Sequence, residues 1–182
     1  MSRAGLIILV YGGLGGIAVL WGAVRGNPNV YLYPGRAPTV AQLAIGPAVG
    51  LALGLVFVFL SRFATHRLEW ARVLHREFHS VVHELTSREI FLLAVFSSIG
   101  EELFFRGALL PQIGLWGSSA LFAALHLRPH LRFLPWTLMS FIVGLVLGSM
   151  YMQLGDLGGP IVAHFTINLL NLNYISKTEL RV

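Results

Sequence analysis

Long apolar stretches separated by short polar breaks dominate the pattern of this chain. Two uncharged stretches, residues 4–24 and 40–60, are each 21 residues long, and about 20 apolar residues in a helix span a bilayer. Four further apolar segments follow, at about residues 90–110, 116–127, 133–154 and 160–174. Proline and glycine interrupt the pattern between them, at 111–115 and 155–159. The pattern therefore predicts six transmembrane helices.

One segment, residues 62–89, has a different pattern. It contains five arginines, four glutamates and four histidines. Its apolar residues recur every three or four positions, as on one face of an amphipathic helix; they are Trp70, Leu74, Phe78, Val81 and Leu85. We expect this helix to lie on the membrane surface or to project from it.

Three histidines of this segment, His75, His79 and His83, follow one another at intervals of four residues. That spacing suits metal ligands on one helix face. However, the histidines stand among arginines, and the second histidine of an HExxH sequence is missing. We therefore interpret the row as a solvated helix face.

The composition also indicates a membrane protein. Of the 182 residues, 55% are hydrophobic and 12% are charged, whereas soluble domains carry roughly 25% charged residues. A water-soluble enzyme and a disordered chain are therefore excluded. We predict an all-α integral membrane protein with about six transmembrane helices and one amphipathic interfacial or cytoplasmic helix. We divide it into an N-terminal part (1–89) with two of the membrane helices, a catalytic four-helix membrane core (90–174) and a polar tail (175–182).

The basic residues indicate how the chain crosses the membrane. The net charge is +5, but the basic residues are dispersed and form no stripe that would suggest a nucleic-acid partner. If the N-terminus is cytoplasmic, ten of the 13 Lys and Arg residues fall on that side, two (Arg25 and Arg36) on the other, and Arg106 inside the membrane. Because cytoplasmic loops are enriched in positive charge, both termini are predicted to be cytoplasmic. The chain has no cysteine, which excludes disulfides and a cysteine nucleophile.

Ionisable side chains inside the predicted membrane helices are candidate functional residues, because each costs roughly 2.5–3.5 kcal/mol to insert. Three pairs of residues, each four apart, share a helix face: Glu102 with Arg106, Phe122 with His126, and His164 with Asn168. Glu101 adds a second carboxylate, about 100° from Glu102 around the helix. Since a helix rises about 1.5 Å per residue, Glu101, His126 and His164 are expected at one level near the middle of the bilayer.

Three motifs resemble those of a known family. Residues 100–107, GEELFFRG, resemble the EExxxR motif of the CAAX protease and bacteriocin-processing family, also called the CPBP or Abi family and related to the type II CAAX prenyl proteases. Residues 122–126, FAALH, resemble its FxxxH motif, and residues 164–168, HFTIN, its HxxxN motif, in the same order. The resemblance covers about residues 90–173 and implies an intramembrane endopeptidase.

The resemblance also implies how the motif residues act. Glu101, with His126, would activate a water molecule as general base. His164 and Asn168 would donate hydrogen bonds to the oxyanion of the tetrahedral intermediate.

The second carboxylate raises the question of a metal. Glu102 and Arg106 resemble the family's internal ion pair, and a pair at this spacing is also explained as purely structural. Glu101, Glu102, His126 and His164 would together offer enough ligands for a catalytic zinc. However, Arg106 competes with such a zinc for the carboxylate of Glu102. We therefore expect no cofactor, and zinc is the less favoured alternative.

Two other functions are alternatives to the endopeptidase. A proton-coupled transporter also uses chains of acids and histidines, but it predicts inverted repeats, which the sequence does not show. A non-catalytic membrane scaffold would not need Glu101 and His126 together. We expect an enzyme of the bacterial inner membrane, embedded in the lipid bilayer, whose substrate is a membrane-anchored protein or peptide. Prenylated proteins, bacteriocin leaders and C-terminal sorting signals all remain open as substrates, and so does the oligomeric state.

Overall fold

The structure is a computed structural model that describes residues 1–180 and has an all-helical fold. Its elements are α1 (Arg3–Val24), α2 (Val40–Arg67), α3 (Glu69–Val82), α4 (Ser87–Glu101), the π-helix η1 (Glu102–Leu109), α5 (Leu110–Leu125), the 3₁₀ helix η2 (Leu131–Phe133), α6 (Leu134–Leu154) and α7 (Gly158–Lys177). Within residues 1–180, the only β-type pairing is an isolated bridge between Leu32 and Asp156. The predicted all-α fold is confirmed. Arg181, one of the ten basic residues assigned to the cytoplasm, and the end of the predicted tail lie outside the described residues.

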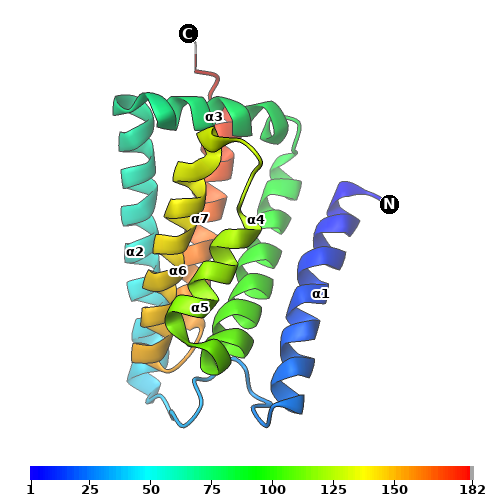
Figure 1. Ribbon diagram of the computed structural model, residues 1–182, viewed down its shortest axis with the longest axis vertical. Coiled ribbons are helices and arrows are strands. Elements are labelled where there is room, and N and C mark those ends of the chain that lie inside the picture. Colours follow the sequence, from blue (N-terminus) through cyan, green and yellow to red (C-terminus); the bar gives the residue numbers. More distant parts are fainter. Residues whose placement is uncertain (181–182) are drawn as a thin grey trace.

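The long helices stand side by side in a bundle, and α3 lies across one end of it (Figure 1). Helix α1 packs along α4 and η1, α2 packs along α7, and α5 packs against α6 and η1. At the α3 end, Arg3 near the N-terminus pairs with Glu84, and α7 ends at the same end of the bundle (Figure 1). The start of the chain, α3 and the end of α7 therefore share one end of the bundle.

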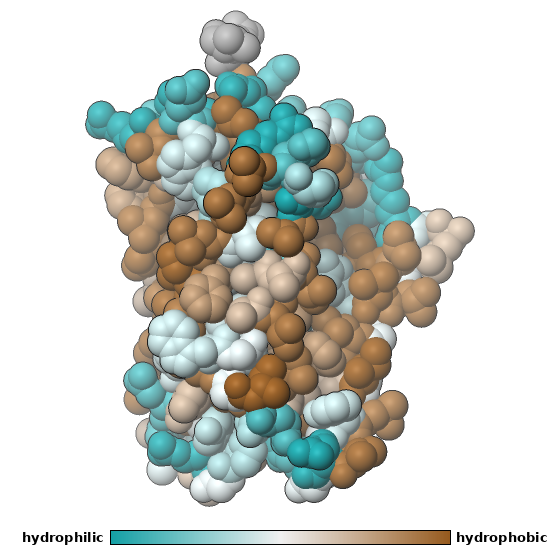
Figure 2. All heavy atoms as spheres, in the orientation of Figure 1, coloured by the Kyte–Doolittle hydropathy of each residue, from teal (hydrophilic) through white to brown (hydrophobic). Residues whose placement is uncertain are grey.

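Four helical stretches are long and apolar enough to cross a membrane: Arg3–Val24, Val40–Arg67, Ser87–Leu125 and Leu131–Leu154. Figure 2 shows hydrophobic residues gathered along the middle of the molecule and hydrophilic residues at its two ends. Helix α7 is not among the four, because it carries His164 and three asparagines and is less apolar. The count of six membrane crossings stays a prediction.

The stretch Ser87–Leu125 reverses direction at Gly114. The φ of Gly114 is 77°, in the left-handed region that glycine adopts without steric cost, and it lies within the turn predicted at 111–115. Helix α5 consequently returns beside η1, where the Ser118 hydroxyl donates to the Phe105 carbonyl at 2.5 Å. The predicted end of the second membrane helix near residue 60 was wrong, since α2 continues to Arg67 and the surface helix α3 begins at Glu69.

Local hydrogen bonds define where α4 and α7 begin. Thr86 and Glu89 form a capping box: the Glu89 N–H donates to Thr86 Oγ1 at 3.2 Å, and the Thr86 N–H donates to Glu89 Oε2 at 2.9 Å. At the start of α7, Asp156 Oδ1 accepts from the Gly158 N–H at 2.7 Å. These two helices carry three of the six candidate residues, Glu101, His164 and Asn168, so their starting points determine the height of these side chains in the bundle.

Two glycines let neighbouring helices approach α4 and α7 closely. A Cβ at Gly100 would collide with the carbonyl oxygen of Tyr11 on α1, and a Cβ at Gly50 would collide with the backbone of Gly159 on α7. Small residues at such contacts allow membrane helices to pack backbone against backbone. Helix α1 therefore presses on α4 directly beside Glu101.

Two histidines of the row, His75 and His79, bind the end of α7. His75 Nε2 lies 2.7 Å from the Thr178 carbonyl oxygen, and His79 Nδ1 lies 2.6 Å from that of Ile175. The prediction of a solvated face was wrong for His75, which is only 4% exposed. The physical reason is that the last carbonyls of a helix lack partners within it, and imidazole N–H groups supply donors. Burial, as the largest cause, lowers the pKa of His75; His79 lowers it further and the Thr178 carbonyl opposes the shift.

Candidate active site

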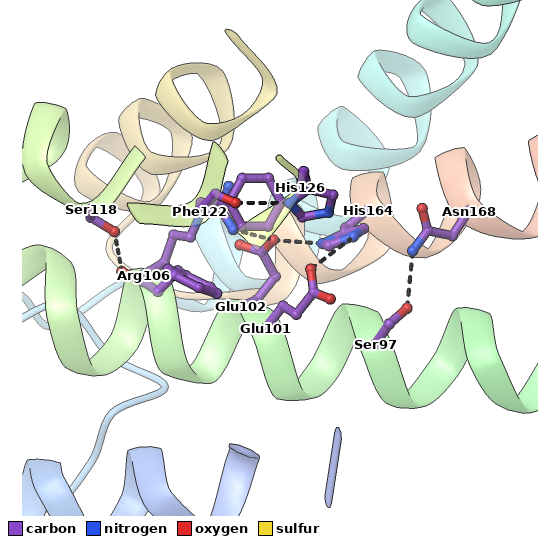
Figure 3. Close-up of polar contacts among 10 residues, drawn as sticks. Ser97, Glu101, Glu102, Arg106, Ser118, Phe122, His126, His164 and Asn168 are labelled. Carbon is purple, nitrogen blue, oxygen red and sulfur yellow. Dashed lines mark hydrogen bonds and ion pairs between the residues drawn. The ribbon is translucent and has the colours of Figure 1, made fainter. Parts of the chain in front are cut away.

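Four of the six candidate side chains meet in the interior, between α4, η1 and α7 (Figure 3). They are almost inaccessible to solvent: Glu101 is 9% exposed, Glu102 0%, Arg106 1% and His164 5%. Glu101 ends α4, Glu102 and Arg106 lie on η1, and His164 comes from α7. The structure thus brings together residues that are more than 60 positions apart in the chain, as the depth argument predicted for Glu101 and His164.

Glu102 is the centre of the cluster. Its Oε1 accepts from Arg106 Nη1 at 2.8 Å and from His164 Nδ1 at 2.7 Å. The guanidinium of Arg106 also lies over the ring of Phe122, at 4.4 Å from its centroid, a favourable cation–π geometry. The carboxylate of Glu102 is therefore neutralised by Arg106 and orients the imidazole of His164.

Glu102 and Arg106 belong to a π-helical turn, which the sequence pattern did not predict. Pattern reasoning extended an ordinary helix to about residue 110, whereas Glu102–Leu109 forms the π-helix η1. Such turns, with hydrogen bonds between residues five apart, are uncommon and occur frequently at functional sites. In this turn the two side chains lie close enough for the 2.8 Å bond between them.

Glu101 faces the other nitrogen of the same imidazole. Its Oε2 lies 3.7 Å from His164 Nε2, too far for a hydrogen bond, and this oxygen is buried without a partner. Although neighbouring residues point about 100° apart around a helix, both acids reach His164 because its two nitrogens lie on opposite sides of the ring. Glu101 therefore keeps a free acceptor inside the cluster.

The hydrogen bonds of His164 define its proton arrangement. A carboxylate only accepts hydrogen bonds, so His164 Nδ1 carries the proton that it shares with Glu102. The second nitrogen, Nε2, faces Glu101. It can accept a hydrogen bond when the imidazole is neutral and can donate one only when the imidazole carries both protons.

His126 lies beside the cluster rather than inside it. Its Nδ1 is 2.8 Å from the Phe122 carbonyl oxygen, so in the neutral ring Nδ1 is the donor and Nε2 is a free acceptor. Its ring lies 4.6 Å from that of Phe122 and 5.5 Å from that of Trp136. The Phe122 ring in turn contacts His164, at 6.1 Å between centroids. Phe122 thus packs between the two histidines.

Asn168 lies one helical turn from His164 and has a partner of its own. Its Nδ2 donates to Ser97 Oγ at 2.9 Å (Figure 3). Ser97 is only 2% exposed and precedes Glu101 by one turn of α4. Sequence reasoning missed Ser97, although its position four residues before Glu101 places it on the same helix face.

The cluster does not have the arrangement of a metal site. Within residues 1–180, no three His, Asp or Glu side chains are grouped so that they could hold a metal ion. A cation on Glu102 Oε1 would also lie against the guanidinium of Arg106, 2.8 Å away. The residues present therefore do not fit the zinc alternative, and the expected absence of a cofactor stays a prediction.

Comparisons with known proteins agree with the three motifs. Residues 85–170 match the family described as "Type II CAAX prenyl endopeptidase Rce1-like", and this range contains all six candidate residues. The chain is 43% identical over 82 residues to the uncharacterized protein YpbD of Bacillus subtilis (strain 168), a match that covers 43% of this chain and 41% of that protein. The match thus spans about two fifths of this relative. No solved structure matches the chain significantly. The recognition of the family is confirmed.

Proposed function

We propose that this chain is an intramembrane endopeptidase, because residues 85–170 match the family described as "Type II CAAX prenyl endopeptidase Rce1-like". It would hydrolyse a peptide bond of a membrane-associated protein or peptide. One observation carries the mechanistic part of the proposal: Glu101 Oε2 is buried, has no partner and lies 3.7 Å from His164 Nε2. Its neighbour Glu102 also has an unpartnered oxygen, Oε2, but its Oε1 already binds both Arg106 and His164, so we assign the reaction to Glu101.

In the proposed reaction Glu101 acts as general base. The oxygen of a water molecule bonds to the carbonyl carbon of the substrate while one proton of that water passes to Glu101. The carbon–nitrogen bond then breaks, and Glu101 returns the proton to the leaving nitrogen. The second proton of the water leaves the new carboxylic acid, so the products are a carboxylate and an amine. His126, whose Nε2 is a free acceptor, would help to orient the water.

The oxyanion would be bound by His164 and Asn168. Since the Nδ1 proton of His164 is committed to Glu102, His164 can donate to an oxyanion only through Nε2 and only with both protons on the ring. Glu102, which accepts from Nδ1, orients the ring for that contact. Glu102 and Arg106 would not touch the substrate but would hold His164 in place.

We also propose the location and the substrate class. The end of the bundle that holds Arg3, α3 and the end of α7 would face the cytoplasm of a bacterial cell, because the charge count assigns ten of the 13 basic residues to that side. The family's name points to a prenylated C-terminal CAAX sequence as substrate; bacteriocin leaders and C-terminal sorting signals are further candidates.

The proposal is tested by comparing protein termini in the membranes of three strains. One expresses the wild-type chain, one Glu101→Gln, and one Glu69→Gln, a matched control on the exposed start of α3. New termini should occur with the wild type and the control and be missing with Glu101→Gln. Identical termini in all three strains would contradict the proposal and favour a scaffold or a proton-coupled transporter.

A further inference from the structure

A second contact joins α4 and α7 beside the pair Glu101–His164. Ser97 lies one turn before Glu101, Asn168 lies one turn after His164, and the two are joined by a 2.9 Å hydrogen bond. In Figure 3 the amide nitrogen of Asn168 points to Ser97, and its amide oxygen points away from α4. The bond therefore fixes which end of the amide faces the helix that carries Glu101.

The orientation of this amide has chemical consequences. A primary amide has two N–H donors on its nitrogen and an acceptor on its oxygen, and the group can turn by 180°. Because Ser97 Oγ accepts one N–H, the second N–H stays on the α4 side and is free for a substrate. A turned amide would instead present its oxygen there and repel an oxyanion.

The hydrogen bond also excludes another use of Ser97. A serine nucleophile needs a base that takes its proton, but the group beside Ser97 Oγ is an amide nitrogen, which donates and cannot accept. Ser97 is thus the acceptor in this contact.

We propose that Ser97 is a positioning residue of the site: it holds Asn168 so that an N–H, and not the carbonyl oxygen, faces the reacting carbonyl. This inference rests on the proposed endopeptidase function and adds to it a residue outside the three motifs. Ser97 acts through Asn168 and does not touch the substrate.

The neighbouring Ser98 is a matched control. It is as deeply buried, at 1% against 2% for Ser97, but its hydroxyl donates to the Val95 carbonyl of its own helix at 3.0 Å. Replacing Ser98 by alanine removes a buried hydroxyl from the same turn without removing a contact to Asn168.

The experiment measures cleavage of a fluorogenic farnesylated peptide that ends in a CAAX sequence, by purified full-length protein in detergent micelles. Ser97→Ala should lower kcat about tenfold, less than the 10²–10³ that follow removal of an oxyanion donor itself, with KM within about twofold. Ser98→Ala should keep kcat within about twofold. In an Asn168→Ala background, Ser97→Ala should cause no further loss, because residues that act as a unit are not additive.

Two outcomes would overturn the inference. One is a Ser97→Ala variant with the kcat of the wild type. The other is a loss of kcat on adding Ser97→Ala to Asn168→Ala that equals the loss caused by Ser97→Ala in the wild-type protein. If Ser97→Ala does not fold, the variants Ser97→Thr and Ser97→Val are compared instead. Their side chains have the same shape, but only threonine keeps the hydroxyl. The Ser97→Thr variant should then have a higher kcat than the Ser97→Val variant. Glu101→Gln separates the two proposals. If it is inactive while Ser97→Ala equals wild type, only the role of Ser97 fails. If wild type and Glu101→Gln cleave equally, the endopeptidase mechanism fails, and the inference fails with it.

Discussion

The substitution Glu102→Gln removes one charge from the centre of the cluster and leaves its shape nearly unchanged. Glu102 is 0% exposed, and its Oε1 accepts from both Arg106 and His164. After the substitution, the guanidinium of Arg106, itself 1% exposed, is buried without the carboxylate that it contacts. We expect a large loss of stability.

The magnitude follows from these contacts. Breaking one partner out of a buried ion pair costs about 3–5 kcal/mol. Glutamine keeps one carbonyl oxygen that can accept from one of the two donors, and the contact of Arg106 with the Phe122 ring remains, worth about 0.5–2 kcal/mol. The lower end, about 3 kcal/mol, is therefore expected. For a domain of this size it corresponds to a fall in Tm of roughly 6–12 °C.

The measurement is the thermal unfolding of the purified protein in detergent, followed by circular dichroism. Glu101→Gln is the matched control, because it makes the same chemical change one residue away, at a carboxylate whose Oε2 has no partner; its Tm should equal that of the wild type. The double variant Glu102→Gln/Arg106→Leu should regain part of the loss, since no uncompensated charge stays buried.

Two results would refute this reasoning. One is a Glu102→Gln variant that unfolds within about 2 °C of the wild type, against the shift expected for this size of domain. The other is a double variant that is less stable than Glu102→Gln alone, since this would mean that Arg106 stabilises the fold through its other contacts and not through the ion pair.

Topology, metal dependence and pH dependence can be tested independently. A cysteine at Ser80 should react with an impermeant thiol reagent only after cells are opened, whereas one at Ala37 should react in intact cells; the opposite pattern would reverse the orientation, and the cysteine-free chain gives no background. Activity should survive chelation and dialysis, and a loss restored by zinc would contradict the metal-free mechanism. Burial lowers the pKa of His75 from its usual 6.5. Below about pH 6.5 the unfolded chain therefore binds a proton that the folded chain excludes, so the stability of the folded state decreases as the pH decreases. Amide exchange in α3, corrected for its intrinsic rate, should be faster at pH 5.5 than at pH 7.5; equal protection would contradict this.

Local patterns were sufficient for several features. The turn at 111–115 was predicted from proline and glycine, and the structure reverses there at Gly114. The pairing of Glu102 with Arg106 followed from a spacing of four residues, and the structure shows the bond at 2.8 Å. Such features depend on residues that are close in the chain, so local spacing is enough to predict which of them meet.

Contacts between distant segments did not follow from local patterns. His75 was expected in solvent, but it binds the end of α7 at Thr178, because the free carbonyls of that helix come to lie beneath α3 only after the bundle has formed. Similarly, Asn168 was assigned to the oxyanion without Ser97, which comes from a helix 71 residues away in the chain.

The sequence by itself determined the class of protein and the set of candidate residues. Uncharged stretches of 21 residues require a bilayer, because so much apolar surface is unfavourable in water, and charges within such stretches are too costly to occur without a reason. Only the tertiary structure decided how the two acids divide their partners. Glu102 binds His164 Nδ1 and Arg106, while Glu101 Oε2 stays free. That division depends on the relative height of α4 and α7, which is set by the packing of two helices that are distant in the chain and not by the spacing of residues along either one.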